Sequence, residues 1–491
     1  MKRLLLSVFV LSFVLMSCDI TDMNEDTKGA TNVAADPLFT SGQFNLGDYL
    51  HNTSVNLNNF KFMAQYFSAT DYPAESRYAF ADRGVSSNIW STLYRGILAN
   101  LQESKEKIKA NDLIGEGEKA NKIASIEVLN VMTYHYMVTL WGDIPYLNAE
   151  GEGEALDPDD NSQPTYKDAE EIYMDLMERL DNAIAMFDPS ADSFGEADNF
   201  YQGDVGKWIK FANSLKLRMG IMLADSNPDI AQTAVEEAAP NAFKSNGDNA
   251  IIPFDSNPPN TNPLWEAIVQ SGRDDYIPSD VLVDKMNELN DPRRPVFYDK
   301  KDGEYIGGPY GEQNAYADFS HLSSLMEESG RPGVIMGYDE VEFILAEAVE
   351  RGYAVTGSAA DHYEKAIRAD MEYWKNLVGD PEIINEDDID AYLAQDEVAY
   401  ATAPGNWKQK IGNQMWLALF LQGTQGWNVF RRLGYPDLQA PTDAVSAAKG
   451  EVPVRFRYPI DEQNYNEQNY NNASEAIGGD EFTNNLFWDV D

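Results

Sequence analysis

Apolar residues recur every three to four positions along most of the chain, which is the pattern of amphipathic helices. In the segment 338–350 the positions that would share one helix face are Val341, Ile344, Leu345, Ala348 and Val349. A second helix is expected after Ser358, because Asp361 three residues later resembles a capping box. Two adjacent helices within about 40 residues have the size of one tetratricopeptide repeat.

The same periodicity predicts helix pairs near residues 86–140, 165–224, 338–378 and 405–433. The segments between these pairs are far longer than the usual connection of about four to six residues, and such loops often carry binding residues. We therefore predict a mainly α fold, an α-solenoid scaffold of about four tetratricopeptide-like helix pairs with long loop insertions and a few short strands.

The segment 240–338 interrupts the helical pattern and holds 10 of the 23 prolines. Proline fixes φ and removes a backbone donor, so a long helix is excluded there. The segment is too rich in aromatic residues for a disordered linker, and we expect a packed loop region with short strands. No domain boundary is evident within it, which favours a single domain over 36–491.

The N-terminus has the order of a lipoprotein signal. Lys2 and Arg3 precede an apolar run over 4–15 that is too short to span a bilayer, and the run ends in Leu-Met-Ser-Cys at Cys18. We expect residues 1–17 to be a signal peptide, Cys18 to be lipidated, and 18–35 to be an acidic tether. The alternative is a plain secretory signal with an incidental cysteine.

The composition excludes several kinds of function. With 81 acidic and 37 basic residues the net charge is −44, which argues against binding a nucleic-acid backbone. The single cysteine allows neither an intramolecular disulfide nor a cysteine-based zinc site. No pair of the four histidines has metal-ligand spacing on a helix, and no catalytic motif is found. We predict no cofactor, no metal and no enzymatic activity, although paired carboxylates for glycoside hydrolysis cannot be read from so acidic a sequence.

Two acidic clusters have part of the spacing of a calcium-binding loop. They are Asp157, Asp159 and Asn161, and Asp225, Asn227, Asp229 and Glu236. Each lacks the glycine at the sixth position, and the second also contains Pro228. A helix N-terminus explains the second cluster better than calcium does. A glycine-rich stretch, Gly303, Gly307, Gly308 and Gly311, has no nucleotide-binding spacing and is interpreted as turns.

Loop aromatics are the remaining chemical signal. Two groups combine rings with charged residues, and their members are Tyr72, Arg77, Tyr78 and Phe80, and Trp265, Arg273, Asp274 and Tyr276. Seven of them, all but Phe80, are the predicted ligand contacts. An exposed ring can stack on the apolar face of a sugar while Arg and Asp reach its hydroxyls. The alternative for each ring is that it only pins its loop to the core.

The chain resembles the SusD/RagB family of Bacteroidetes outer-membrane lipoproteins in three features taken together. These are the lipoprotein signal that ends at Cys18, the dispersed helix pairs and the proline-rich insertion. The stretches that carry the resemblance are 36–39, 90–94, 134–146, 207–218, 340–350, 425–432 and 457–459. The resemblance covers nearly all of the chain after Cys18, although no single stretch is diagnostic.

The resemblance implies a lipid-anchored nutrient-binding protein of the cell outer membrane that faces the exterior. Such a protein captures an oligosaccharide and delivers it to a SusC-like TonB-dependent transporter. Peptide binding, as in RagB-like members, is the alternative within the family, and a surface glycoside hydrolase is a less favoured alternative. Ligand residues vary between family members, so the seven loop residues above remain our own prediction.

Overall fold

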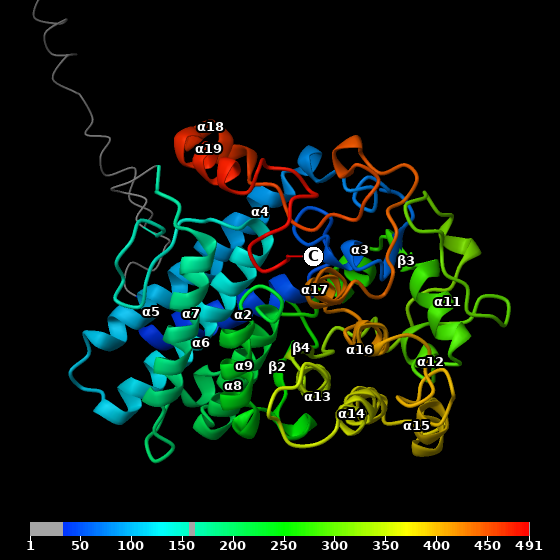
Figure 1. Cartoon of the computed structure of the whole chain (residues 1–491), viewed down its shortest axis with the longest axis horizontal. Coiled ribbons are helices and arrows are strands. Elements are labelled where there is room, and N and C mark those ends of the chain that lie inside the picture. The colour runs from blue at the N-terminus through cyan, green and yellow to red at the C-terminus, as the bar shows by residue number, and fades with distance from the viewer. Residues whose placement is uncertain (1–32, 157–162, 491) are drawn as a thin grey trace, which may run out of the picture. The chain divides into compact units, whose positions relative to one another are not determined.

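Helices account for most of the regular structure in the computed structural model, which describes residues 33–156 and 163–490 (Figure 1). The longer helices are α2 (Ala35–His51), α4 (Val85–Ser91), α5 (Ala99–Lys109), α6 (Glu116–Trp141), α7 (Ala169–Met186), α8 (Val205–Met222), α9 (Pro228–Ala238), α11 (Asp280–Glu288), α13 (Tyr338–Glu350), α14 (Ala359–Val378), α15 (Glu386–Leu393), α16 (Trp407–Ala418), α17 (Gly423–Leu433) and α19 (Glu467–Ala476). The shorter ones are α3 (Phe60–Met63), α10 (Pro263–Trp265), α12 (Arg294–Phe297) and α18 (Ile460–Tyr465). The predicted mainly α fold is confirmed.

Consecutive helices pack in pairs, namely α6 with α7, α8 with α9, α13 with α14, and α16 with α17. The predicted cap of α14 is present, because the Ser358 hydroxyl accepts a hydrogen bond from the Asp361 amide at 3.1 Å. Asp168 caps α7 in the same way, so that helix begins at Ala169 rather than at Thr165. The apolar segment 405–433 forms two helices, and Leu421 lies between them with a φ of 73°.

Helix α6 passes through the interior, and buried side chains occur all around its last five turns. Its Glu127 is the one acidic residue in this buried stretch, and it accepts hydrogen bonds from Lys105 of α5 at 2.7 Å and from Arg179 of α7 at 2.8 Å. Because a buried carboxylate must be paired, this triad fixes the relative positions of α5, α6 and α7.

Further buried ion pairs link later helices. Arg218 of α8 makes a two-pronged contact with Glu340 of α13, with both nitrogen–oxygen distances at 2.6 Å. Glu347, also on α13, pairs with Arg351 and with Arg432 of α17. The scaffold is therefore held by apolar packing and by charge pairs that require specific helix positions.

The proline-rich region contains short strands and short helices, as expected. Strand β1 (Phe67–Ala69) pairs antiparallel with β3 (Tyr276–Pro278), and β2 (Ala250–Ile252) pairs antiparallel with β4 (Gly333–Met336). Three of these four strands lie within 240–338. The β2–β4 pair therefore closes the loop region on itself, and the β1–β3 pair joins it to the segment that follows α3.

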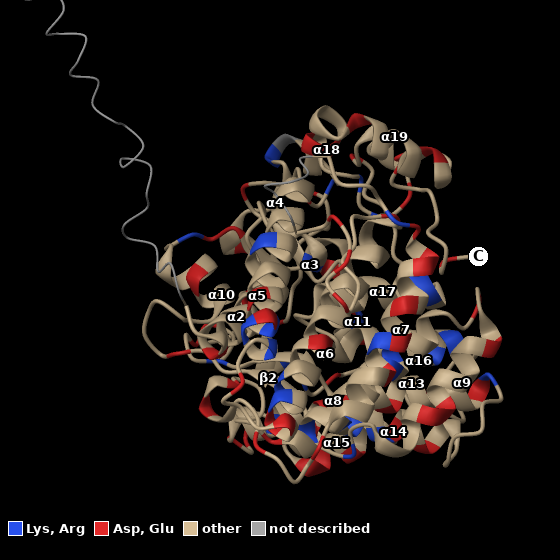
Figure 2. Ribbon diagram, turned by 90° about the vertical axis from the view of Figure 1, so that its left-hand side faces the viewer, with Lys and Arg blue, Asp and Glu red and all other residues tan. Residues whose placement is uncertain are grey.

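Acidic positions occur on helices and loops throughout the described chain, with basic positions between them (Figure 2). Within residues 33–156 and 163–490, no helix combines the length and the apolar character that a membrane crossing requires. The predicted signal peptide, Cys18, the tether up to residue 32 and the first calcium candidate, Asp157 to Asn161, lie outside the described residues.

Candidate functional site

The pairing of β1 with β3 brings together two loop segments that are about 200 residues apart. Ala69 lies opposite Tyr276 in the ladder, and the Thr70 amide extends it by donating to the Asp275 carbonyl at 3.1 Å. The Thr70 hydroxyl also donates to the Asp274 carbonyl. The loop that follows β1 therefore runs beside the loop that precedes β3, and the two groups of candidate residues meet there.

Tyr72 is at the centre of this junction. Its side chain is 37% exposed and lies outside the hydrophobic core. Cζ of Arg83 is 4.9 Å from the centroid of its ring, and Cζ of Arg273 is 5.3 Å from it. Each arginine is paired with a carboxylate of its own loop, Arg83 with Glu75 and Arg273 with Asp275 at 2.6 Å. A partly exposed ring is thus surrounded by charged groups whose positions are fixed by ion pairs.

A third segment adds Tyr316, which was not among the predicted residues. The Tyr316 ring stacks on His321 with a centroid distance of 3.8 Å, and Nε2 of His321 donates to the Tyr316 carbonyl at 2.9 Å. Burial, followed by the charge of Asp274, raises the pKa of the Tyr316 phenol to about 12. The segment that precedes Tyr316 is tied to β1, because the Asn314 amide donates to the Ala69 carbonyl at 3.1 Å.

Two of the glycines interpreted as turns allow this third segment to approach β3. A Cβ atom on Gly307 would lie 2.4 Å from the Ser279 carbonyl oxygen, and one on Gly308 would lie 2.3 Å from the Ile277 side chain. The Gly308 amide donates to the Pro278 carbonyl at 2.9 Å. The glycine-rich stretch indicates in the sequence that the backbone can approach another segment closely. The sequence alone does not identify β3 as that segment.

The other predicted residues have different surroundings. Tyr78 and Tyr276 are buried, and the Tyr276 hydroxyl donates to the Thr53 carbonyl. Arg77 is half-buried; its Nε donates to the Gly311 carbonyl at 2.6 Å, and it faces Asp443 at 3.4 Å. Trp265 is partly exposed at the end of α10 and lies outside the hydrophobic core, and no ring or cation contact joins it to Tyr72 in the described structure. The structure thus brings Tyr72, Arg273 and Asp274 together, with buried Tyr276 in the adjoining strand β3, whereas Tyr78 is buried beside Phe80.

The second calcium candidate has the geometry expected of a helix N-terminus. Asp225 pairs with Arg351 at 2.7 Å, and Asn227 immediately precedes α9. Glu236 accepts the Ala354 amide at 2.7 Å. In the described part of the chain no three metal-ligating side chains converge.

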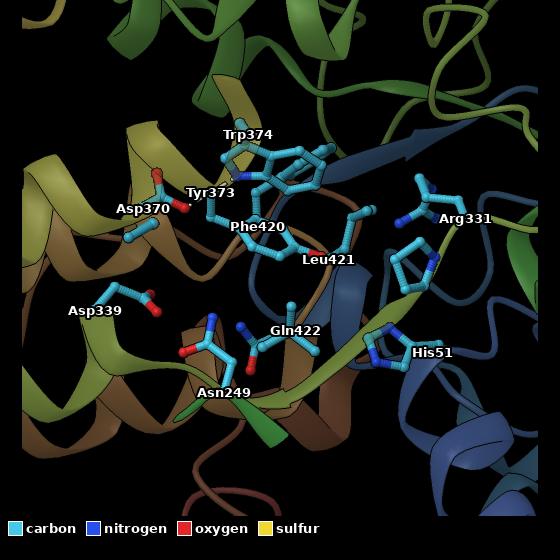
Figure 3. A pocket seen from close by; sticks show the side chains of 13 residues that line it. His51, Asn249, Arg331, Asp339, Asp370, Tyr373, Trp374, Phe420, Leu421 and Gln422 are labelled. Atoms are coloured by element: carbon cyan, nitrogen blue, oxygen red, sulfur yellow. Dashed lines mark hydrogen bonds between the residues drawn. The ribbon is translucent and has the colours of Figure 1, made fainter. Parts of the chain in front are cut away.

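A small polar cavity of about 20 Å³ lies in the interior (Figure 3). Asp339 and Asp370 line one end and His51 and Arg331 the other, with Gln422 near the middle. Burial, followed by the charge of Asp370, raises the pKa of Asp339 well above its usual range. Burial lowers the pKa of Arg331 to about 10 and that of His51 to about 3. The cavity has room for about one water molecule, so it cannot hold a nutrient.

The paired-helix scaffold with a loop-borne, partly exposed aromatic surface defines a helical-repeat protein built for binding. A family model for SusD-like proteins, described as "Starch-binding associating with outer membrane", matches residues 27–459. The chain belongs to this SusD-like family.

Solved structures agree with this assignment. A chitin-binding protein is 25% identical, with a TM-score of 0.79 over 93% of this chain and 100% of that one. A SusD homologue from Bacteroides uniformis is 25% identical, with a TM-score of 0.74 over 92% and 99% of the two chains. A chitin-binding SusD homologue from Flavobacterium johnsoniae shares the fold, at 22% identity and a TM-score of 0.76 over 92% and 99%. A search of curated protein sequences finds no match.

Proposed function

We propose that this protein binds an oligosaccharide at the cell surface and delivers it to a SusC-like TonB-dependent transporter of the outer membrane. The observation that carries the proposal is the Tyr72 junction, where three distant segments present a ring outside the core among fixed charged groups. The family assignment supports the outer-membrane setting, and the two chitin-binding relatives support a glycan as ligand. The lipid anchor at Cys18 is part of the proposal.

We assign the ligand contacts to Tyr72, Arg273 and Asp274, with Trp265 at a separate position on the same loop region. The Tyr72 ring would stack on the apolar face of a sugar, and the charged groups would reach its hydroxyls. Tyr78 and Tyr276 are buried, so they would hold the loops from below rather than contact the ligand. Arg77 would tie the same loop to the segment that contains Asp443.

Calorimetry with chito-oligosaccharides and malto-oligosaccharides tests the proposal on the purified protein. Tyr72→Ala should weaken binding about two- to tenfold, the loss expected when one stacked ring contributes about 0.5–1.5 kcal/mol. Tyr465→Ala is the matched control, because Tyr465 is 70% exposed on α18, outside the proposed contact residues. Equal affinity for the parent protein, Tyr72→Ala and Trp265→Ala would overturn the assigned residues.

Other outcomes would select another function. Binding of peptides without binding of any glycan would favour a peptide-binding member of the family. Turnover of a glycan by the purified protein would favour a surface hydrolase. Co-purification with a TonB-dependent transporter tests the proposed partner, and mass spectrometry of the N-terminal peptide of the mature protein tests lipidation of Cys18.

A further inference from the structure

A second recess, separate from the Tyr72 junction, lies between the loop around Phe80 and the C-terminal segments. Its volume is about 400 Å³. Five aromatic residues line it, namely Phe80, Phe456, Phe482, Tyr78 and Tyr458. Phe80 stacks on Phe456 with centroids 5.0 Å apart, and Phe482 meets Phe80 edge-on at 5.9 Å. A recess of this size with an aromatic floor has the dimensions of a small-molecule site.

The rim of the recess is also apolar. Ile460, the first residue of α18, is 55% exposed there. Ala81 is exposed and Val445 and Ala447 are half-buried around the same opening. Apolar surface gathered around a hollow remains in contact with water until a ligand covers it, and covering it favours binding.

One cationic side chain in the lining, Arg457, has nitrogen donors that make no hydrogen bond within the described chain. The Arg457 side chain is 41% exposed, and its Nε donates to the Asp480 carbonyl at 2.8 Å. The Asp480 carboxylate is 3.8 Å from that Nε, but its Oδ1 already accepts from Arg455 at 2.8 Å and from the Tyr458 amide at 3.1 Å. The two Nη atoms of Arg457 have no hydrogen-bond partner among the described residues, and its Cζ lies 6.0 Å from the Phe482 ring.

A second polar group in the lining has no partner. The Ser87 hydroxyl is buried and makes no hydrogen bond in the described structure. That hydroxyl has almost no accessible surface, so Arg457 is the polar side chain of the lining to which we assign a ligand contact. An anionic head group accepts hydrogen bonds from a guanidinium.

We infer that this recess binds an arylalkanoate, that is, an aromatic ring joined through a short alkyl chain to a carboxylate. The ring lies against Phe80, Phe456 and Phe482, where it can make edge-on or offset contacts. The carboxylate accepts hydrogen bonds from the Nη atoms of Arg457. This inference does not depend on the proposed glycan function, because none of the residues assigned to glycan contact lines the recess.

Two probes of equal apolar size separate the two parts of the inference. Calorimetry with 4-phenylbutyrate and with 4-phenylbutan-1-ol compares a ligand with the anionic head and one without it. The parent protein should bind the carboxylate about tenfold more tightly than the alcohol. Arg457→Gln should remove that preference and leave the affinity for the alcohol unchanged. Lys285→Gln, on the remote helix α11, is the matched control for loss of one positive charge.

Filling the recess tests its location. Ala447→Phe and Ala81→Phe place a ring in the opening from opposite sides, and each should abolish binding of both probes while the melting temperature stays within a few degrees of the parent value. Two variants are used so that a folding defect in one does not decide the result. The inference is overturned if neither probe binds the parent protein at millimolar concentration, if both filled variants bind normally, or if Arg457→Gln keeps the preference for the carboxylate.

Discussion

The buried imidazole of His135 should make the protein sensitive to acid, and the size of the effect follows from its surroundings. His135 lies inside α6, is fully buried, and has no hydrogen-bond partner for either ring nitrogen among the described residues. Burial, followed by the charges of Arg218 and Arg431, lowers the pKa of His135 to about 3. The ring therefore stays neutral in the folded protein at pH values where the unfolded chain, with a pKa near 6.5, takes up a proton.

The sign and the magnitude follow from this difference. Because the folded-state pKa is depressed, the contribution of His135 to stability is present above about pH 6.5 and is lost as the pH falls. Between about pH 8 and about pH 5 the unfolded state gains about 2 kcal/mol from protonation of this one residue. The result is insensitive to the folded-state pKa as long as that value is well below 5.

The variant His135→Phe removes the titrating group and keeps a ring of similar size against Tyr173, whose centroid lies 5.5 Å away. Urea unfolding followed by tryptophan fluorescence gives the free energy of unfolding of the variant and the parent at about pH 8 and about pH 5. The quantity to compare is the difference in the free energy of unfolding between variant and parent at each pH. Burial raises the pKa values of Asp48 and Asp143 to about 6, and these groups stabilise both proteins as the pH falls, opposite to His135. Relative to the parent, the variant should gain about 2 kcal/mol on going to the lower pH.

His362 supplies a control of opposite sign. Its Nδ1 lies 2.5 Å from Glu342 and its Nε2 lies 2.6 Å from the Thr356 carbonyl, and the hydrogen bond to Glu342 is the largest of the effects that raise its pKa. Its contribution is present below the unfolded pKa and is lost as the pH rises through the folded pKa, so His362→Gln should lose stability relative to the parent at about pH 5. A pH-independent difference for His135→Phe would refute the argument, since it would mean that the native ring already binds a proton or water. If His135→Phe does not fold, His135→Leu tests the same point.

Two further predictions use the same unfolding assay, and a third uses ligand binding. Asp339→Asn should stabilise the protein at neutral pH, and the gain in the free energy of unfolding should grow as the pH rises. The reason is that the raised pKa of Asp339 keeps a proton on the folded state that the unfolded state releases. Destabilisation instead would mean that a cation in the cavity neutralises the carboxylate. Glu340→Gln should cost about 3–5 kcal/mol because it leaves Arg218 buried without its carboxylate, whereas Glu237→Gln, which removes an exposed partner of Lys216, should cost less than about 1 kcal/mol. In binding assays Asp274→Asn should weaken a neutral glycan without changing the melting temperature, and unchanged affinity would exclude Asp274 from the ligand contacts.

The helices could be predicted because their signals are local. The apolar face of the segment 338–350 and the Ser358 cap each depend on residues within one or two turns, and both are present. A helix pair was predicted over 405–433, but the residue at which it breaks was not, because Leu421, which adopts the positive φ between α16 and α17, is neither a glycine nor a proline. Buried pairs such as Arg218 with Glu340 were not predictable either, since the two residues are 122 positions apart.

The candidate site could be predicted only in part from the sequence, because the contacts that assemble it also join residues far apart in the chain. Composition and proline content directed attention to the loops that hold Tyr72 and Arg273, but the strands that join these loops have three residues each. A three-residue strand has too little alternation to identify its partner. Tyr316 was missed because its approach depends on Gly307 and Gly308, whose lack of a side chain matters only once β3 is beside them.

The two buried rings show what sequence alone leaves open and why the answer matters for binding. All three tyrosines lie in loop segments with charged neighbours, so composition does not separate a ring that contacts a ligand from one that supports a loop. The difference arises from the opposing segment: Tyr276 is covered by Phe62 and Phe67 and bonded to Thr53, whereas Tyr72 is partly exposed beside two arginines. A buried ring beneath the junction holds the loops before any ligand arrives. The exposed ring then loses little conformational freedom on binding, which is the condition under which one stacked sugar ring yields useful affinity.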